Sequence, residues 1–345
     1  MAQLKLGLNT GYWAGGPPLG AAESVLEAER LGFDSIWTAE AYGSDALMPL
    51  AWWGAATEQI KLGTAIVQIS ARTPAATAMA AMTLDHLSGG RVILGLGVSG
   101  PQVVEGWYGQ SFAKPLARMR EYIGILREIW ARQGPLVNAG PHYPLPLPDA
   151  TGLGKPLKSS IHPLRANIPI YLAAEGPKNI AMAGELCEGW LALFYSPHHD
   201  DFYREALTEG LGRPGAHCAQ EDFEVAATVP LIVTDDIEAA ADAVRPMYAL
   251  YFGGMGAKGT NFHANVAIRM GYEAEVEKIQ ALYLSGHKDE AAAAIPTKLV
   301  EQLTLIGPAD KLRHDLEAWR ESLVTTLLIG GDAQTLRTAA ELVLG

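Results

Sequence analysis

The sequence predicts an α/β fold, a closed (β/α)8 TIM barrel with insertions, in one domain that spans residues 1–345. Three observations predict it. The chain has a length that one α/β barrel can use, short apolar or β-branched runs alternate with segments of helical period, and eight such runs can be counted. An open doubly wound sheet has the same local alternation. The choice therefore depends on the count of eight and on a strand–helix unit at each end of the chain.

The predicted elements follow one another in strict order. Each predicted strand is about as long as a buried strand, and most are followed by a helical pattern. The eight strands are predicted at 4–9, 35–39, 61–67, 91–97, 169–174, 190–195, 223–233 and 325–330. The helices are predicted at 21–31, 46–57, 74–87, 115–132, 177–187, 200–210, 237–251 and 332–344.

Two insertions interrupt this repeat. Residues 134–167 contain seven prolines and cannot form a regular helix, so we expect an irregular excursion there. Residues 253–306 carry further helical patterns before the last strand. In a barrel both insertions would follow strand ends, where loops can cover a cleft.

Composition narrows the class of protein and its partners. Hydrophobic residues make up 49% and charged residues 19%, which allows a large core and argues against a disordered or fibrous chain. The formal charge is −12, from 26 Lys and Arg against 38 Asp and Glu. This negative charge would repel the phosphate backbone of a nucleic acid, so we expect no nucleic-acid partner.

Cysteine usage and the first residues predict a cytoplasmic protein. The two cysteines, Cys187 and Cys218, have no CxxC spacing and cannot build a disulfide framework or a four-ligand zinc site. Residues 1–8 lack the features of a secretory signal. No apolar run approaches the roughly 18 residues that span a bilayer, so no membrane association is expected.

Histidine and aspartate fragments do not predict a metal site. His198, His199 and Asp200 are adjacent, as are Asp85 and His86. Adjacent side chains point apart on a helix or a strand, and neither fragment has a partner at a metal-ligand spacing. We therefore expect no metal.

A GxGxxG motif occupies residues 95–100, directly after a predicted strand. The dinucleotide-binding interpretation fails because Pro101 follows at once, a long helix is predicted only near residue 115, and no acidic residue ends a second strand about 20 positions later. Two interpretations remain. The glycines line a strand end where the Ser99 hydroxyl is available to a ligand, or they serve tight barrel packing.

Residues 175–179, with the sequence EGPKN, lie between an apolar strand and an Ala-rich helix. Pro177 suits the first turn of a helix, and the free amides beside Gly176 form a favourable anion site to which Lys178 adds positive charge. This predicts a bound phosphate. Against it, many such turns serve capping alone, and the carboxylate of Glu175 would oppose an anion.

Four more side chains are predicted at the carboxyl ends of strands or over them. Glu40 ends the second strand, where a carboxylate could hold a proton or orient a cofactor, or simply cap the strand. Tyr12 and Trp13 end the first strand and could stack on a flat ring or fill the barrel mouth. His263 lies in the late insertion, where it could cover the mouth or remain a surface residue.

Several longer blocks resemble a known family. The blocks LGTAI at 62–66, RTP at 72–74 and LDHLSGGR at 84–91, followed by GLG at 95–97, resemble signatures of the bacterial-luciferase-like superfamily, above all its deazaflavin branch. The blocks EAYGSD at 40–45, GVSGPQVVEGWYG at 97–109 and AEGPKN at 174–179 resemble actinobacterial coenzyme F420-dependent oxidoreductases. The similarity covers nearly the whole chain.

This resemblance implies a barrel whose carboxyl face binds the deazaflavin. It implies a non-proline cis peptide at the end of the third strand, here between Ala65 and Ile66, and a cofactor phosphate near Gly176. The residues that it places around the cofactor are Glu40, Val98, Ser99, Glu175 and Gly176, with the bond between Ala65 and Ile66 supporting the ring. Gly100, Pro177 and Lys178 are further candidates for cofactor binding.

The chain also departs from the sugar-phosphate dehydrogenases of this branch. Ala41 stands where they carry a catalytic histidine, and Gly100 stands where they carry a second acid. Alcohol oxidation by their mechanism is therefore not expected. Reduction of a carbonyl, an imine or an activated C=C bond needs only a hydride and a proton donor. The candidate donors are Glu40, Tyr12, Tyr108 or a water, and the candidate substrate contacts are Tyr12, Trp13 and His263.

The resemblance therefore predicts a coenzyme F420-dependent oxidoreductase that transfers a hydride between deazaflavin C5 and a small organic substrate. One alternative is an FMN-dependent monooxygenase on the same barrel, which would react with oxygen at the flavin. A second alternative is a flavin- or deazaflavin-binding protein without turnover. Because relatives of this type are commonly dimers, a homodimer is expected.

Overall fold

The computed structural model describes residues 3–13, 15–256 and 261–345. Its centre is a closed barrel of parallel strands in the order β3-β2-β1-β11-β8-β7-β6-β5-β4, and β3 pairs with β5 to close the ring. The strands are β1 (Lys5–Gly11), β2 (Ser35–Thr38), β3 (Lys61–Thr64), β4 (Val67–Gln68), β5 (Val92–Gly97), β6 (Ile170–Ala173), β7 (Gly189–Leu193), β8 (Glu224–Thr228) and β11 (Thr326–Ile329). The predicted (β/α)8 barrel is confirmed, with β3 and β4 together forming its third strand.

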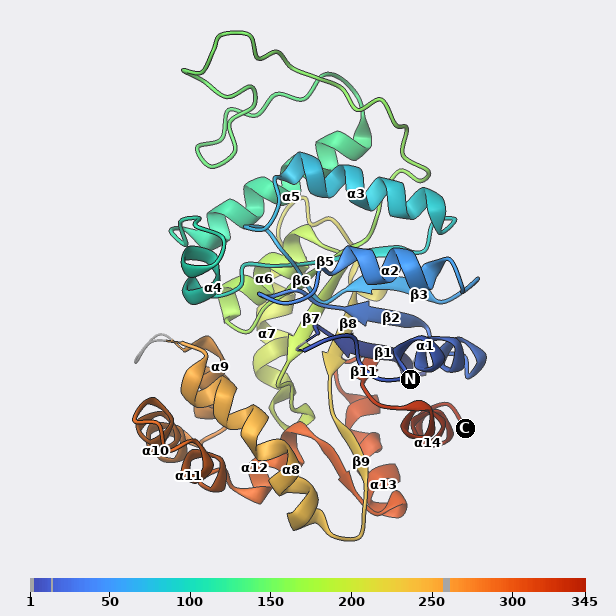
Figure 1. The fold of residues 1–345 in the computed structure, drawn as a ribbon, viewed down its shortest axis with the longest axis vertical. Coiled ribbons are helices and arrows are strands. Elements are labelled where there is room, and N and C mark those ends of the chain that lie inside the picture. The colour runs from blue at the N-terminus through green and yellow to red at the C-terminus, as the bar shows by residue number, and fades with distance from the viewer. Residues whose placement is uncertain (1–2, 14, 257–260) are drawn as a thin grey trace.

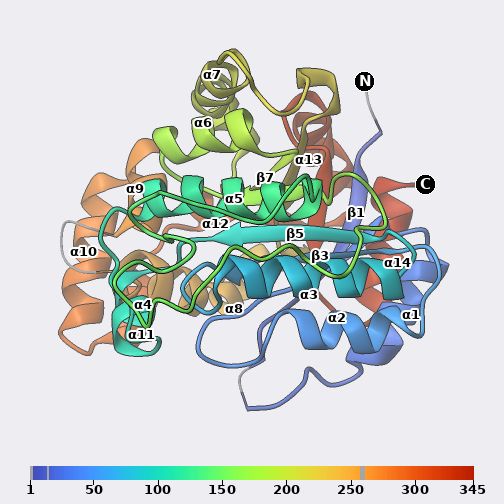
Figure 2. The same ribbon diagram turned by 90° about the horizontal axis from the view of Figure 1, so that it is seen from above.

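A ring of helices surrounds the barrel (Figures 1 and 2). The ring consists of α1 (Ala21–Arg30), α2 (Leu47–Gly54), α3 (Pro74–Leu87), α5 (Pro115–Ala131), α6 (Pro177–Leu186), α7 (Asp200–Leu211), α13 (Ala309–Glu321) and α14 (Ala333–Val343). Three of these helices begin with proline, which fits because the first-turn amide has no partner inside a helix.

The predicted strand 223–233 is wrong in one respect, because the structure divides it. Val229 still donates its N–H to the carbonyl of Leu328 at 3.1 Å, but Pro230 has no N–H with which to continue the ladder. The chain then leaves the barrel, and β9 (Leu231–Val233) pairs in parallel with β10 (Leu305–Gly307) as a separate two-stranded sheet.

The helix predicted at 237–251 exists but does not belong to the barrel ring. It is α8 (Ile237–Ala249), continued by a π-helical turn, Leu250–Gly254. It packs in a second hydrophobic core with the helices α9 (Phe262–Arg269), α10 (Glu273–Leu284), α11 (Lys288–Ala293) and α12 (Thr297–Leu303). The ring position is taken by α13, because the chain returns to the barrel only after β10.

The proline-rich segment lies on the outside of the barrel. Within it Asn138 and Leu145 form an isolated antiparallel bridge, and the Leu145–Pro146 peptide is cis. Glu121 of α5 accepts hydrogen bonds from this segment, and His86 of α3 contacts the carbonyl of His162 at 2.7 Å. Figure 1 shows the segment extending beyond α3 and α5, at the opposite end of the molecule from α10 and α11.

Two aromatic rings lie in the barrel interior, packed together with Ile93, Leu191, Ala226 and Leu328. The centroids of Trp37 and Tyr171 are 5.6 Å apart, and glycines on adjacent strands make room for them. A Cβ at Gly63 would lie 2.4 Å from the Trp37 ring, and one at Gly189 would lie 2.7 Å from the Tyr171 ring. The interior is therefore a packed core, and ligands have access only to the two ends of the barrel.

None of the helices in the described part of the chain is both long and apolar enough to cross a bilayer.

Candidate active site

The carboxyl ends of the barrel strands gather most of the predicted site residues. Glu40 follows β2, the pair Ala65 and Ile66 separates β3 from β4, Ser99 follows β5, and Glu175 follows β6. Parallel strands in one barrel end on the same face. In both ribbon views α4 (Pro101–Gly106), which follows β5, lies on the same side of the molecule as α9 and α10 (Figures 1 and 2). The late insertion therefore reaches this mouth of the barrel.

The peptide between Ala65 and Ile66 is cis, as the family resemblance predicts. The side chain of Ile66 packs on Gly97, where an added Cβ would lie 2.6 Å from Ile66 Cδ1. At Gly95 an added Cβ would lie 1.7 Å from the Thr64 carbonyl oxygen. These contacts favour tight packing as the reason for the glycines of β5.

The end of β5 also corrects one argument from the sequence. A short helix, α4, begins directly at Pro101 with Gly100 before it, so a helix does follow the glycine motif well before residue 115. Ser99 has a φ of +59°, and Phe194, at the end of β7, has a φ of +57°. Left-handed backbone is uncommon for residues other than glycine and often accompanies functional sites.

Glu40 is buried and fixed by four hydrogen bonds. Its Oε1 accepts from the backbone N–H of Gln68 at 2.9 Å and from Arg72 Nη1 at 2.7 Å. Its Oε2 accepts from Arg72 Nη1 at 2.8 Å and from the N–H of Ala46 at 3.3 Å. The Arg72 guanidinium also pairs with Asp45. These contacts hold the Glu40 carboxylate in one position.

Sequence reasoning missed Arg72 and Gln68 as site residues. In the sequence Arg72 stands out only as part of the RTP block, and no spacing rule links it to Glu40, 32 positions earlier. The side-chain amide of Gln68 donates to the carbonyls of Glu40 and Ala41, both at 3.0 Å, while its buried Oε1 has no partner in the described ranges. The Tyr108 hydroxyl donates to the Ala41 carbonyl at 3.1 Å, and burial, followed by the charge of Glu40, raises the Tyr108 pKa.

An acid–base pair lies where the insertion meets the mouth. His263 Nδ1 is 2.6 Å from Glu175 Oε1, and Arg269 donates to the Glu175 backbone carbonyl at 2.9 Å. The His263 ring meets Tyr251 edge to face, with centroids 4.9 Å apart, and meets Phe194 at 5.9 Å. The insertion thus brings its predicted histidine onto a predicted strand-end residue.

Tyrosines connect this pair to the first two strands. Burial raises the Tyr251 pKa to about 12, helped by the proximity of Tyr12, Glu175 and Tyr42. Burial and Tyr42 also raise the Tyr12 pKa. Because these couplings fall off with distance, the side chains form one cluster across the mouth. Tyr42 and Tyr251 were not predicted, since nothing in the local sequence distinguishes them.

The turn after β6 leaves open space at a helix start. Gly176 precedes α6, no side chain caps the helix, and an added Cβ at Gly176 would meet nothing within 4 Å. Pro177 and Lys178 are exposed, and Lys178 forms no ion pair in the described part of the chain. The free amides at the start of α6 and the exposed ammonium of Lys178 are both hydrogen-bond donors. These features fit an anion such as a phosphate.

Trp13 lies beside the mouth cluster. Its backbone N–H donates to Ser44 Oγ at 2.9 Å, and its ring lines a pocket of about 550 Å³ between the loop after β1 and helix α2. Trp52 and Met48 line the same pocket, which makes it largely apolar. Among the described residues no three His, Cys, Asp or Glu side chains are grouped so that they could hold a metal ion.

A closed barrel with acid–base and aromatic groups at its carboxyl mouth has the architecture of a TIM-barrel enzyme. The chain belongs to the luciferase-like monooxygenase family, whose sequence model matches residues 8–326. This confirms the family to which the sequence blocks pointed.

Relatives cover nearly the whole chain. It is 56% identical, over 99% of both chains, to a protein of Mycobacterium tuberculosis that carries the provisional name coenzyme F420-dependent oxidoreductase. It is 27% identical to the 5,10-methylenetetrahydromethanopterin reductase of Archaeoglobus fulgidus, over 89% of this chain and 87% of that protein. The fold matches the coenzyme F420-dependent tetrahydromethanopterin reductase of Methanopyrus kandleri with a TM-score of 0.81, at 22% identity over 99% of both chains.

Proposed function

We propose that this protein is a coenzyme F420-dependent oxidoreductase that reduces a carbonyl, an imine or an activated C=C bond of a small organic substrate. The 56% identical relative carries a name of this kind, and the sequence blocks resemble the same group. When bound, the reduced deazaflavin would supply the hydride from C5. The protein would supply position, electrostatics and a proton.

The residues at the mouth fit such a cofactor. Ala65, Ile66, Val98, Ser99 and Gly100 would line one side of a flat ring. The orphaned amide oxygen of Gln68 offers an acceptor for an N–H at the ring edge, because a buried acceptor without a partner is costly unless a ligand satisfies it. The turn at 175–178 would hold the phosphate.

The observation that carries the proposal is the contact between His263 and Glu175. Reduction of a carbonyl or imine adds a hydride to carbon and a proton to the heteroatom, so a proton donor must face the substrate. Histidine is suited to this task near neutral pH, and a carboxylate bound to its other nitrogen orients the ring. We therefore assign proton donation to His263, with Glu175 as its positioning residue.

His263 was predicted only as a substrate contact, and the proton donors predicted from the sequence, Glu40, Tyr12 and Tyr108, are less well placed. All four contacts of Glu40 are accepted hydrogen bonds, so we propose that it is a positioning residue. The hydrogen of the Tyr108 hydroxyl is directed at a backbone carbonyl. Tyr12 is 38% exposed at the mouth and is proposed to contact the substrate, as is Trp13.

The first experiment is a cofactor titration. The purified protein is mixed with F420 and, separately, with FMN, while tryptophan fluorescence is followed. We expect quenching by F420. Binding of FMN alone would overturn the proposal and favour an FMN-dependent monooxygenase, the alternative that the family's name supports.

The second experiment tests turnover and the proton donor. Oxidation of reduced F420 is followed across enones, imines and aldehydes. We expect His263→Gln to lower kcat about 100-fold and to alter the pH profile, with F420 affinity unchanged. The matched control, His287→Gln, changes an exposed histidine on the insertion and should have no effect. Unchanged kcat in His263→Gln would refute the assignment, and silence on every substrate with cofactor bound would favour a binding protein without turnover.

A further inference from the structure

Exposed aromatic side chains surround the mouth of the barrel. They come from four segments that are remote in the sequence: the loops after β1 and β2, the end of α4 and the start of α9. Large apolar side chains that are exposed together mark an interaction site. We call these residues, which are between 38% and 66% exposed, the aromatic collar: Tyr12, Tyr42, Trp107 and Phe262.

Three of the collar residues lie on loops that contact one another. The Tyr108 hydroxyl donates to the carbonyl of Ala41 at 3.1 Å, and these two residues are the chain neighbours of Trp107 and Tyr42. A Cβ added to the glycine that follows Tyr42 would lie 3.7 Å from Cδ2 of Tyr12. The loops after β1, β2 and β5 therefore bring their exposed rings to one side of the mouth.

The fourth ring comes from the late insertion. Phe262 directly precedes His263, whose ring lies 4.9 Å from the Tyr251 ring between centroids and whose Nδ1 contacts Glu175. Burial, followed by the proximity of Tyr12, raises the Tyr251 pKa to about 12. The insertion therefore extends towards the loop after β1, and Phe262 is next in the chain to the proposed proton donor.

The charged side chains near the collar already have partners or another task. Arg72 is shared by the carboxylates of Glu40 and Asp45. Lys178 and Arg269 lie at the turn that is proposed to hold the cofactor phosphate. What the collar itself offers to a substrate is therefore aromatic surface and neutral hydroxyl groups, which favour an uncharged ligand.

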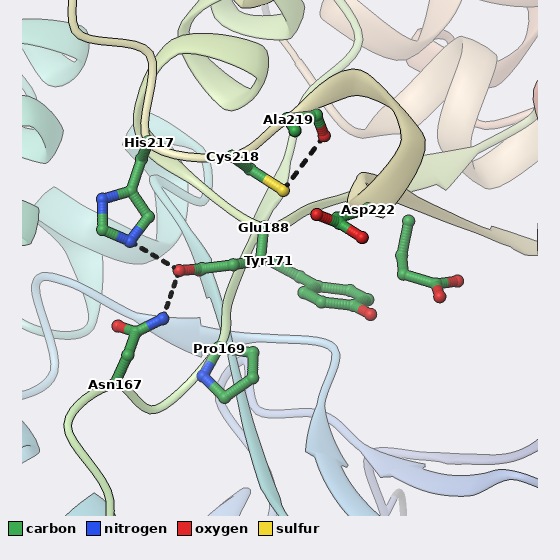
Figure 3. Close-up of a pocket in the computed structure, with 9 residues that line it drawn as sticks. Asn167, Pro169, Tyr171, Glu188, His217, Cys218, Ala219 and Asp222 are labelled. Carbon is green, nitrogen blue, oxygen red and sulfur yellow. Dashed lines mark hydrogen bonds and ion pairs between the residues drawn. The ribbon is translucent and has the colours of Figure 1, made fainter.

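The cavity at the opposite end of the barrel is a poorer candidate for the substrate. It has a volume of about 410 Å³ and is bounded by the amino-terminal ends of β6, β7 and β8 (Figure 3). Figure 3 shows Glu188 in contact with both Asn167 and His217, and Arg127 also pairs with this carboxylate. Its central carboxylate is therefore satisfied within the protein, and TIM-barrel enzymes react at the other end.

We propose that the substrate is a neutral, planar molecule whose reducible carbonyl or C=C bond is conjugated to an aromatic ring, and that the aromatic collar binds this ring. This inference rests on the proposed function, because it names a substrate class for the same reaction. In an enone, the hydride from C5 adds to the β carbon and the π electrons move towards the carbonyl. The α carbon then takes the proton, so the substrate is reduced and the cofactor oxidised.

The test uses the full chain loaded with oxidised F420 and three probes of matched length. Benzylideneacetone is neutral and aromatic, its cyclohexyl analogue has a non-planar ring of similar size, and its para-carboxylate adds a negative charge. Dissociation constants are measured by calorimetry, and turnover is measured with reduced F420. We expect benzylideneacetone to bind about tenfold more tightly than either analogue, which is the order of the gain from aromatic contacts.

Two variants and one control locate the bound ring. Tyr42→Leu and Phe262→Leu each remove an aromatic face but keep an apolar side chain at an exposed position. Each should reduce the preference for benzylideneacetone over its cyclohexyl analogue to about threefold, with F420 affinity unchanged. The matched control, Trp52→Leu, removes a 78% exposed ring on α2, outside the collar, and should keep the full preference.

Equal binding of the aromatic and cyclohexyl probes, tighter binding of the carboxylate, or no binding of any probe would overturn the proposal. An unchanged preference in both collar variants, or its loss in Trp52→Leu, would also overturn it. The calorimetry is repeated without F420. Turnover without an aromatic preference would refute this proposal alone, whereas an aromatic preference in a protein that does not bind F420 would refute only the proposed function.

Discussion

Replacement of Arg72 by methionine isolates the role of the contact between Arg72 and Glu40. Glu40 is almost completely buried, and Arg72 supplies its only positive partner among the described residues. Methionine keeps much of the length and apolar surface of arginine but removes the charge. The carboxylate would then lie in a buried site with two backbone amides and no counter-charge.

Removal of one partner from a buried ion pair costs roughly 3–5 kcal/mol, because the remaining charge stays buried without compensation. The Arg72 side chain is 20% exposed, so water reaches part of the site and the lower end, about 3 kcal/mol, is expected here. With an unfolding entropy of about 2.1 cal/mol/K per residue over 345 residues, a loss of about 3 kcal/mol corresponds to a fall of about 4 °C in the thermal midpoint.

The assay is thermal unfolding by circular dichroism, together with the F420 titration. Arg30→Met is the matched control, because Arg30 is 64% exposed in its pair with Glu27 and its loss should not move the midpoint measurably. Addition of Glu40→Gln to Arg72→Met should recover part of the loss by removal of the unpaired charge. If the double variant melts lower than Arg72→Met, the uncompensated charge is not the cause and the reasoning fails.

Three further predictions follow from single contacts. Gly97→Ala should weaken F420 binding about tenfold in a fluorescence titration, because the new Cβ would displace Ile66. The control is Gly106→Ala, where an added Cβ meets nothing within 4 Å. Equal F420 affinities of the two variants would contradict the predicted role of the contact between Gly97 and Ile66. The Glu185 pKa is lowered from 4.5 to about 2, first by a hydrogen bond from Arg120. On acidification the Glu185 carboxylate is therefore protonated in the unfolded chain before it is protonated in the folded one, and the free energy of unfolding should fall between pH 4.5 and about 2. Glu185→Gln should show a shallower fall of the thermal midpoint over that range. An identical slope in the two proteins would count against the stabilising pair of Glu185 with Arg120. Sedimentation velocity should show a particle of two chains at micromolar concentration, and a monomer would refute the predicted homodimer.

The barrel could be predicted because its signal is local. Each strand is a short apolar run with a helix pattern behind it, and parallel strands necessarily bring their carboxyl ends together. The sequence therefore predicts Glu40, Ser99 and Glu175 at one face of the barrel. The break between β8 and β9 was not predicted, because apolar residues lie on both sides of Pro230 and the pattern looks like one continuous strand. The only local signal of the break is that Pro230 lacks the N–H that a strand needs.

The partners of these residues could not be predicted in the same way. Arg72 reaches Glu40 across 32 positions, and His263 reaches Glu175 across 88. Such contacts depend on how the loops and the insertion fold back over the barrel, and no periodicity or spacing encodes that path.

The sequence by itself determined the barrel, the family blocks and the face on which the site lies, because local periodicity and strand direction fix them. Tertiary structure alone decided that Glu40 is held by Arg72 and that His263 meets Glu175. The physical reason is that charge pairing and burial depend on distances between segments remote in the chain, which only the folded core sets.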